Sequence, residues 1–258
     1  MLAIEGDPNG LFWDDAASVL YVADDDGNRI LRWTDARGFE LAAALPQGGS
    51  GLGQVVRGHD GSLVVTRFGH GKSGDVVRVA SSGESAIVPG LDPTRRRIGL
   101  TVAAGSGFFD AWFVRLETGE RVGAVGRLSL DGVEDELIVG LKKPVGVLAI
   151  DRELFVSDQD TGRILKASIE DPSSYGVFAA LEGPDLLAAG PDRSLFTGGA
   201  GGKLYRIEAD GAVKRLASGF RQVRGVAYDG TQRRLFVADH DADASDGLHH
   251  ALHVLPVD

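Results

Sequence analysis

The chain has 258 residues, a formal net charge of −10 and no cysteine. The missing cysteines exclude disulfides, thiolate metal sites and cysteine nucleophiles, and the acidic balance disfavours a nucleic-acid partner. No run approaches the roughly eighteen apolar residues of a membrane helix, and the first ten residues lack the pattern of a secretion signal. We therefore expect a cytoplasmic protein that does not enter a membrane; a leader already removed from a longer precursor is the open alternative.

A repeated pattern begins at Pro8 and first ends at Trp33. It consists of a strand after a Pro-Asn-Gly turn, a second strand at 20–23, an Asp-rich loop at 24–28 and a third strand at 29–33. The turn before the first strand returns five times, with intervals of 44, 44, 48, 40 and 39 residues counted through Gly53. These positions are Asn9, Gly53-Gln54, Arg97, Val145, Asp185 and Arg224. Intervals of about 40–50 residues leave room for four short strands and are typical of propellers.

The later strands follow the same pattern of short β-branched or aromatic runs between glycine and aspartate. Second strands are expected at 63–66, 112–114, 154–157, 195–197 and 235–238, and third strands at 75–79, 126–130, 163–167, 203–207 and 251–255. The last repeat ends after its third strand, whereas residues Leu2 to Ile4 precede the first repeat. Because an open sheet edge invites aggregation, we predict that Leu2 to Ile4 complete the last blade. The predicted fold is an all-β, six-bladed β-propeller with four-stranded blades, a single domain over residues 1–258.

One face of such a propeller collects two sets of loops. The connections from fourth to first strand and from second to third strand emerge together beside the central channel. The first set forms the inner ring of six positions given above, and the second set forms outer loops at 24–28, 67–72, 115–122, 158–162, 198–202 and 239–250. We expect the functional site on this face.

The repeats PNGLFWDDAASVLYVADDDGNRIL, VGVLAIDRELFVSDQDTGRIL and RGVAYDGTQRRLFVADHD resemble a known superfamily. It is the six-bladed senescence marker protein (SMP-30), gluconolactonase and luciferin-regenerating enzyme superfamily, with NHL-type repeat texture, and the resemblance covers the whole chain. It implies a divalent cation, usually calcium, at the channel mouth. The family holds this cation with a Glu near the start of the first blade, Asn residues from middle blades and an Asp in a Pro-Asp-Gly turn.

Matched motif by motif, the family's Glu position falls on Asn9, because Trp13 matches the tryptophan that follows this ligand. The Asp position falls on Asp185, in the sequence Pro-Asp-Leu, so the resemblance makes Asn9 and Asp185 the candidate metal ligands. A shifted register would instead supply Glu5 as the carboxylate. The middle Asn positions fall on Arg97 and Val145, which cannot bind a cation.

These departures predict a degraded metal site. Calcium takes about six to eight oxygen ligands, whereas the inner ring offers one carboxylate and one amide beside two guanidinium groups. Our hypothesis is a polar site for an anionic or carbonyl-bearing small molecule, contacted by Arg97, Arg224 and Asn9 and oriented by Asp185. A guanidinium group offers a planar fork for carboxylate or phosphate. The alternative for both arginines is an ion pair that only lines the channel.

Asp185 is the first candidate catalytic residue, as a general base, although an Asp after Pro is also a common turn residue. His70 is the second candidate, because flanking glycines leave its imidazole exposed and histidine is a side chain suited to general-base catalysis near pH 7. A surface histidine without a role is the alternative. The segment Asp239 to His250 contains four Asp and three His; a metal site and a solvated acidic loop both remain open there.

The function that these residues favour is a small-molecule hydrolase, lactonase-like or esterase-like, at the channel mouth. With a bound cation, the metal would polarise the carbonyl and Asp185 would activate water. The alternative is a non-catalytic ligand-binding or protein-interaction propeller with a degraded metal site. A condensing enzyme resembling strictosidine synthases fits the fold but lacks a readable acid residue. We expect a monomer that binds a small anionic molecule or a lactone.

Overall fold

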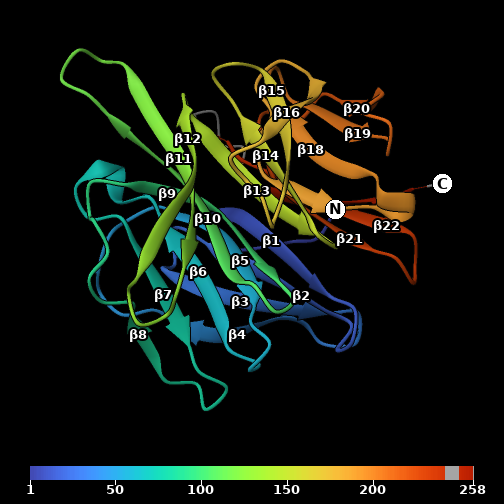
Figure 1. Ribbon diagram of the computed structural model, residues 1–258. Helices are drawn as coiled ribbons and strands as arrows, with labels where there is room; N and C mark the ends of the chain where they lie inside the picture. Colours follow the sequence, from blue (N-terminus) through green and yellow to red (C-terminus); the bar gives the residue numbers. More distant parts are fainter. Residues whose placement is uncertain (242–249, 258) are drawn as a thin grey trace.

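The computed structural model describes residues 1–241 and 250–257, which form the propeller drawn in Figure 1. Over these residues the chain builds five four-stranded sheets and one three-stranded sheet, all antiparallel and arranged around a central channel. Two short 3-10 turns, η1 (Gly69–Gly71) and η2 (Pro191–Arg193), are the only helical elements in the described residues. The predicted all-β, six-bladed fold is confirmed. No helix in the described part of the chain is long and apolar enough to span a bilayer.

Strands follow one another in each blade in chain order, with the first strand of each blade at the channel. Blade 1 contains β1 (Pro8–Asp14), β2 (Val19–Asp24), β3 (Arg29–Thr34) and β4 (Gly38–Ala44), and blade 2 contains β5 (Leu52–Arg57), β6 (Leu63–Arg67), β7 (Asp75–Val79) and β8 (Ser85–Ile87). Blade 3 contains β9 (Arg96–Ala103), β10 (Gly107–Arg115), β11 (Arg121–Leu128) and β12 (Glu134–Leu141), and blade 4 contains β13 (Pro144–Ile150), β14 (Glu153–Asp158), β15 (Arg163–Ser168) and β16 (Tyr175–Ala180). Blade 5 contains β17 (Leu187–Ala189), β18 (Leu195–Gly199), β19 (Lys203–Ile207) and β20 (Val213–Ser218), and blade 6 contains β21 (Val223–Asp229), β22 (Arg234–Asp239) and β23 (Ala251–Pro256).

The predicted strands lie close to the observed ones, and β7 and β19 have the predicted bounds. Blade 3 differs, because β10 and β11 are longer than the expected 112–114 and 126–130 and β11 begins earlier. The reason is compositional. The run GFFDAWFVR contains five aromatic or β-branched residues after its single initial glycine, and neither glycine nor proline interrupts it before residue 116.

The inner strands are irregular where they reach the channel mouth. Their pairing with the second strands shifts between Pro8 and Leu11, between Leu52 and Val55, between Pro144 and Gly146, and between Val223 and Val226. Such bulges add a residue to one strand and change the direction of its side chain. In β9 the shift lies between Arg97 and Gly99, so the residue inside the bulge is Ile98.

Neighbouring inner strands approach one another backbone to backbone. A Cβ on Gly10 would lie less than 3.0 Å from the carbonyl oxygen of Gly53, and a Cβ on Gly53 would lie equally close to that of Ile98. Farther round the ring, Gly225 of the last blade meets the carbonyl oxygen of Asn9 in the first blade. These approaches require glycine, because real Cβ atoms do not come so close to backbone atoms.

The first and last blades also share an aromatic cluster. Trp13 and Trp33 of blade 1 each lie with ring centroids 5.5 Å from that of Phe236 in blade 6, and all three rings are buried. Aromatic pairs at this separation add to the stability that area burial alone supplies. The two tryptophans are therefore packing residues between blades.

In the described residues, the last blade has three strands of its own. The amide of Leu2 donates a hydrogen bond of 2.8 Å to the carbonyl of Leu252 in β23, and this pairing is an isolated bridge. Leu2 and Ile4 are half-buried and pack against the apolar cluster of blades 1 and 6. No regular strand forms at residues 2–4, so closure by an N-terminal strand stays a prediction.

We predict that replacing Leu2 and Ile4 together with alanine lowers the free energy of unfolding by about 1–3 kcal/mol, because both side chains leave an apolar cluster. Chemical denaturation measures this change. Leu116→Ala, on an exposed loop, is the control and is expected to change it by less than about 0.5 kcal/mol. Equal stability of the double variant and the control would show that the N-terminal segment does not help to close the ring.

Candidate functional site

A cavity of about 450 Å³ opens at the channel mouth. The inner strands and the β2–β3, β6–β7, β14–β15 and β22–β23 loops all contribute to it, as the propeller topology predicts. The residues that line it are Asn9, Asp25, Phe68, His70, Arg96, Ile98, Phe113, Lys143, Val145, Gln159, Asp185, Gln222, Arg224 and His240. The lining therefore combines titratable and amide groups with a few apolar side chains.

Asp185 is the most strongly perturbed acid of this cavity. Its residue is 9% exposed, and burial raises the pKa of its carboxyl to about 6, although the positive charge of Arg224 opposes this shift. One carboxylate oxygen accepts the amide N–H of Leu186 at 3.0 Å. The hydroxyl of Ser157 donates to the Asp185 carbonyl at 2.8 Å, which anchors the backbone. The side chain is thus held in one orientation at the channel wall.

Gln159 and Lys143 orient the other oxygen of Asp185. The Lys143 ammonium donates to Gln159 Oε1, so the amide nitrogen of Gln159 must face the opposite way. That nitrogen donates to Asp185 Oδ2 at 3.2 Å. Burial lowers the pKa of Lys143. A carboxylate with two fixed donors keeps further lone pairs for a ligand or a water molecule.

Three cationic side chains line the same cavity: Arg96, Lys143 and Arg224. Arg224 Nε is buried and has no hydrogen-bond partner among the described residues. Arg96 donates to the carbonyl of His70 at 2.9 Å, and burial lowers its pKa. The carboxyls of Asp185 and Asp25 line the same cavity, and burial raises the pKa of Asp25 as well. The arrangement favours an anionic ligand.

Arg97 does not line the channel, which corrects the expectation from the sequence. Its guanidinium group is fully buried inside blade 3, where it binds Glu134 through two nitrogens at 2.6 and 2.9 Å and also pairs with Asp110. The inner-ring position belongs to Ile98, inside the bulge. Because side chains alternate along a strand, an error of one residue moves a side chain to the other face. Arg96, on the other side of Arg97 along the chain, reaches the cavity.

The buried group of Arg97, Asp110 and Glu134 balances its charge internally. Burial raises the pKa of Asp110 even beside Arg97, whereas for Glu134 the hydrogen bond and charge of Arg97 outweigh burial and lower the pKa. Arg95 also donates to Glu134 at 2.6 Å, so two guanidinium groups face the two carboxyls. The cluster is therefore a structural element of blade 3.

Two further predicted residues reach the cavity. Asn9 is buried and lies at the bulge of β1, and His70 is exposed at the rim. His70 has a left-handed backbone, φ 49°, between two glycines with positive φ, and its ring lies edge-on to Phe68 at 5.1 Å. The predicted Gly53-Gln54 position is different. Gln54 lines a second cavity of about 440 Å³. This cavity and the one at the channel mouth have no lining residue in common.

The ring does not fit calcium. The positions that the resemblance assigns to cation ligands contain one carboxylate, Asp185, one amide, Asn9, and the apolar side chains Ile98 and Val145. Arg224 and Lys143 act on Asp185 as positive charges, and both would repel a cation. Calcium needs about six to eight oxygen ligands, so this set falls short.

Several cavity residues were not singled out from the sequence: Asp25, Arg96, Lys143, Gln159 and Gln222. Their loops were placed on this face, but side-chain directions depend on the bulges. His240 lies in the segment Asp239 to His250, which the sequence left open as a metal site or a solvated loop. One signal was readable. The dipeptides Ile98-Gly99, Val145-Gly146 and Arg224-Gly225 share a pattern that aligns Ile98, and not Arg97, with the inner ring. The part of the predicted Asp239 to His250 loop at residues 242–249 lies outside the described residues.

The chain was compared with protein families, curated sequences and solved structures, and only the solved structures gave matches. No protein-family model and no curated sequence matches the chain. Among solved structures it is similar to a luciferin-regenerating enzyme, with a TM-score of 0.73, 14% identity, and 96% of this chain and 89% of that chain covered. It is also similar to regucalcin of Agrobacterium tumefaciens, described as a calcium-binding protein, with a TM-score of 0.74, 14% identity, and 97% and 90% covered.

A third similar structure is a gluconolactonase of Xanthomonas campestris, with a TM-score of 0.71, 18% identity, and 91% of this chain and 84% of that chain covered. The structural neighbours thus bear the names that the repeat resemblance predicts. At such identities the likeness shows a common fold.

We predict that Arg97→Met lowers the free energy of unfolding by about 3–5 kcal/mol, because the buried Asp110 carboxyl loses its guanidinium partner and Glu134 keeps only Arg95. Arg96→Met makes the same change one residue earlier and is expected to cost less than about 1 kcal/mol, since Arg96 is only half-buried. Denaturant unfolding at pH 7 compares the two. A stable Arg97→Met protein would contradict the structural role of Arg97.

Proposed function

We propose that the protein is a small-molecule hydrolase, lactonase-like or esterase-like, with its active site in the cavity at the channel mouth. The observation that supports this most is Asp185, an oriented carboxyl with a pKa of about 6 on the wall of a polar cavity. A base with a pKa near the working pH transfers protons efficiently, and strongly shifted groups in clefts mark functional sites. The name of the gluconolactonase among the structural neighbours is consistent with lactone chemistry.

In the proposed reaction, ionised Asp185 accepts a proton from water while the water oxygen attacks the carbonyl carbon of an ester or lactone. The electron pair of the C=O bond moves to the oxygen, and the guanidinium of Arg224 stabilises this charge. Collapse of the tetrahedral intermediate breaks the C–O bond of the leaving group, and the alkoxide takes the proton from Asp185. The products are an alcohol and a carboxylic acid, which then loses its proton to water and becomes a carboxylate. Both groups belong to one molecule when the substrate is a lactone.

The substrate that we propose is anionic or becomes anionic in the reaction. Arg96, Lys143 and Arg224 surround the cavity, and a guanidinium fork suits carboxylate or phosphate. Asn9 supplies an amide for hydrogen bonds to the ligand. His70, at the rim, is a second proton-transfer candidate that contacts the outer end of the ligand. Arg97 has no part in the site, since it is buried in blade 3.

A second candidate function is ligand binding without turnover. It is favoured by Ile98 and Val145, which stand where the resemblance expects metal-binding Asn residues. In that case the cavity binds a small anion, and Asp185 only contributes to the polarity of its wall.

We predict that kcat/KM for lactone hydrolysis falls about tenfold per pH unit below pH 6 and is level above it, because only ionised Asp185 accepts a proton. Asp185→Asn is expected to lower kcat by about 10²–10⁴-fold at pH 7.5. A panel of lactones and esters, assayed from pH 4.5 to 8, measures both effects.

The matched control for Asp185→Asn is Asp25→Asn, which neutralises a half-buried carboxyl of the same cavity. It should keep the fall below pH 6. EGTA in the assay should leave the rate unchanged, because the ring does not fit calcium. If the fall below pH 6 disappears in Asp25→Asn but remains in Asp185→Asn, then Asp25 is the base and the assignment to Asp185 is wrong. Tight calcium binding abolished by Asp185→Ala would restore the metal mechanism.

We also predict that Arg224→Gln moves the low-pH fall of kcat/KM to higher pH, because the positive charge of Arg224 holds the pKa of Asp185 down. The plateau rate should fall by about 10²–10³-fold with the loss of a charged donor. Arg215→Gln, on the exposed face of β20, is the control and should change neither quantity.

Inorganic phosphate separates the two candidate functions. Phosphate binding measured by calorimetry should weaken in Arg224→Gln under either function. Phosphate binding without turnover of any panel member would favour the binding function over the hydrolase.

A further inference from the structure

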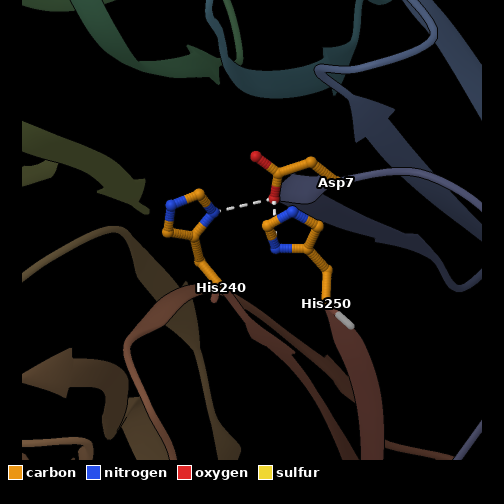
Figure 2. A group of neighbouring side chains, drawn as sticks. All are labelled: Asp7, His240 and His250. Carbon is orange, nitrogen blue, oxygen red and sulfur yellow. Dashed lines mark hydrogen bonds and ion pairs between the residues drawn. The ribbon is translucent and has the colours of Figure 1, made fainter. Parts of the chain in front are cut away.

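Asp7, His240 and His250 gather at the seam between the first and last blades (Figure 2). Asp7 lies just before β1, His240 follows β22 and His250 precedes β23. Asp7 and His240 are 233 positions apart in the sequence, so only closure of the ring brings them together. His240 also lines the channel-mouth cavity.

The distances between these groups match those of neighbouring metal ligands. Asp7 Oδ1 lies 2.9 Å from His240 Nδ1 and 3.3 Å from His250 Nδ1, and one ligand atom from each residue lies within 4.8 Å of the others. First-row metals bind imidazole nitrogen and carboxylate oxygen at about 2.0–2.2 Å, which places adjacent ligand atoms about 3 Å apart. A single ion can therefore reach all three residues after small side-chain movements.

The charges of Asp7, His240 and His250 also favour a bound cation. Asp7 is 5% exposed, and no Lys or Arg pairs with it in the described part of the chain. The amide of Asp241 donates to His250 Nδ1 at 3.0 Å, so this nitrogen has a lone pair although it faces the Asp7 carboxylate. The two imidazoles are stacked with centroids 4.8 Å apart. A bound dication would replace the amide hydrogen bond and compensate the buried carboxylate.

We propose that Asp7, His240 and His250 form a binding site for a first-row transition-metal dication, and that the bound ion links the N-terminal segment to the last blade. Two imidazoles and one carboxylate suit Zn²⁺, Co²⁺ or Ni²⁺, whereas calcium requires an oxygen shell. The site is separate from the Asn9 and Asp185 positions at the ring.

The bound ion would connect the N-terminal segment to blade 6, where few other contacts close the ring. Blade 6 has three strands, and Leu2 adds only an isolated bridge to β23. A ligand that binds the folded state alone stabilises it in proportion to its free concentration over Kd. Because the three ligands come together only in the closed ring, metal binding and closure are one equilibrium.

The experiment uses the full chain, freed of metal with EDTA and dialysed. Zn²⁺ is added in thermal unfolding and calorimetry, Co²⁺ in absorption spectroscopy, and Ca²⁺ at equal concentration as the contrasting ion. We expect one Zn²⁺ per chain, a Tm raised by several degrees, a visible Co²⁺ band from imidazole coordination, and no comparable effect of Ca²⁺.

Asp7→Asn and His240→Gln should each weaken Zn²⁺ binding by about a hundredfold or more and remove the Tm rise. The matched control is His253→Gln in the same blade, because His253 also lies beside a carboxylate, with Nε2 3.4 Å from Asp239, but has no second histidine in its group. If Asp7→Asn does not fold, His240→Gln, which is half-buried, decides the question. Zn²⁺ binding that survives both substitutions, or that His253→Gln weakens equally, would overturn the site. Binding without a Tm rise would overturn the link.

Discussion

Backbone contact between neighbouring inner strands is the constraint on which this propeller depends. Glycines at positions such as Gly10, Gly99 and Gly225 let each inner strand meet the backbone of the next blade, and a Cβ at any of them would lie closer than 3.0 Å to that backbone. The same constraint selects the site. The residue before the glycine lies in a bulge and reaches the channel mouth, as Asn9, Ile98, Val145 and Arg224 do. Fold and candidate chemistry thus share one structural cause.

Two groups of buried carboxyls show how surroundings decide a role. Asp110 and Glu134 accept hydrogen bonds from the guanidinium of Arg97 inside a blade, so both carboxyls are paired with a positive charge. Asp185 has amide donors at both oxygens and lies on a cavity wall with unpaired positive charge nearby. Burial raises the pKa of Asp185 to about 6, while incomplete pairing leaves the group free to react. A catalytic acid or base needs this combination of desolvation and access.

The ring and the seam differ in the kind of ion that they can hold. At the ring, apolar side chains occupy two positions where the resemblance expects oxygen ligands, and positive charges lie nearby, so hard cations are disfavoured. At the seam, two imidazoles and a carboxylate from opposite ends of the chain converge on a single point (Figure 2). Nitrogen ligands belong to softer transition metals, and their location connects metal chemistry to closure of the propeller.

The sequence by itself determined the number of blades, most strand positions and the face that contains the site. Repeat spacing and short apolar runs are local signals, so β7 and β19 could be placed to the residue, and Asn9, Asp185 and Arg224 could be placed at the channel. Only the tertiary structure decided the register of β9, because three consecutive arginines leave the repeat alignment ambiguous and side-chain direction has a period of two. The tertiary structure also decides the contact between Asp7 and His240 and the raised pKa of Asp185. Distances across the closed ring and burial are properties of packing, which no local pattern encodes.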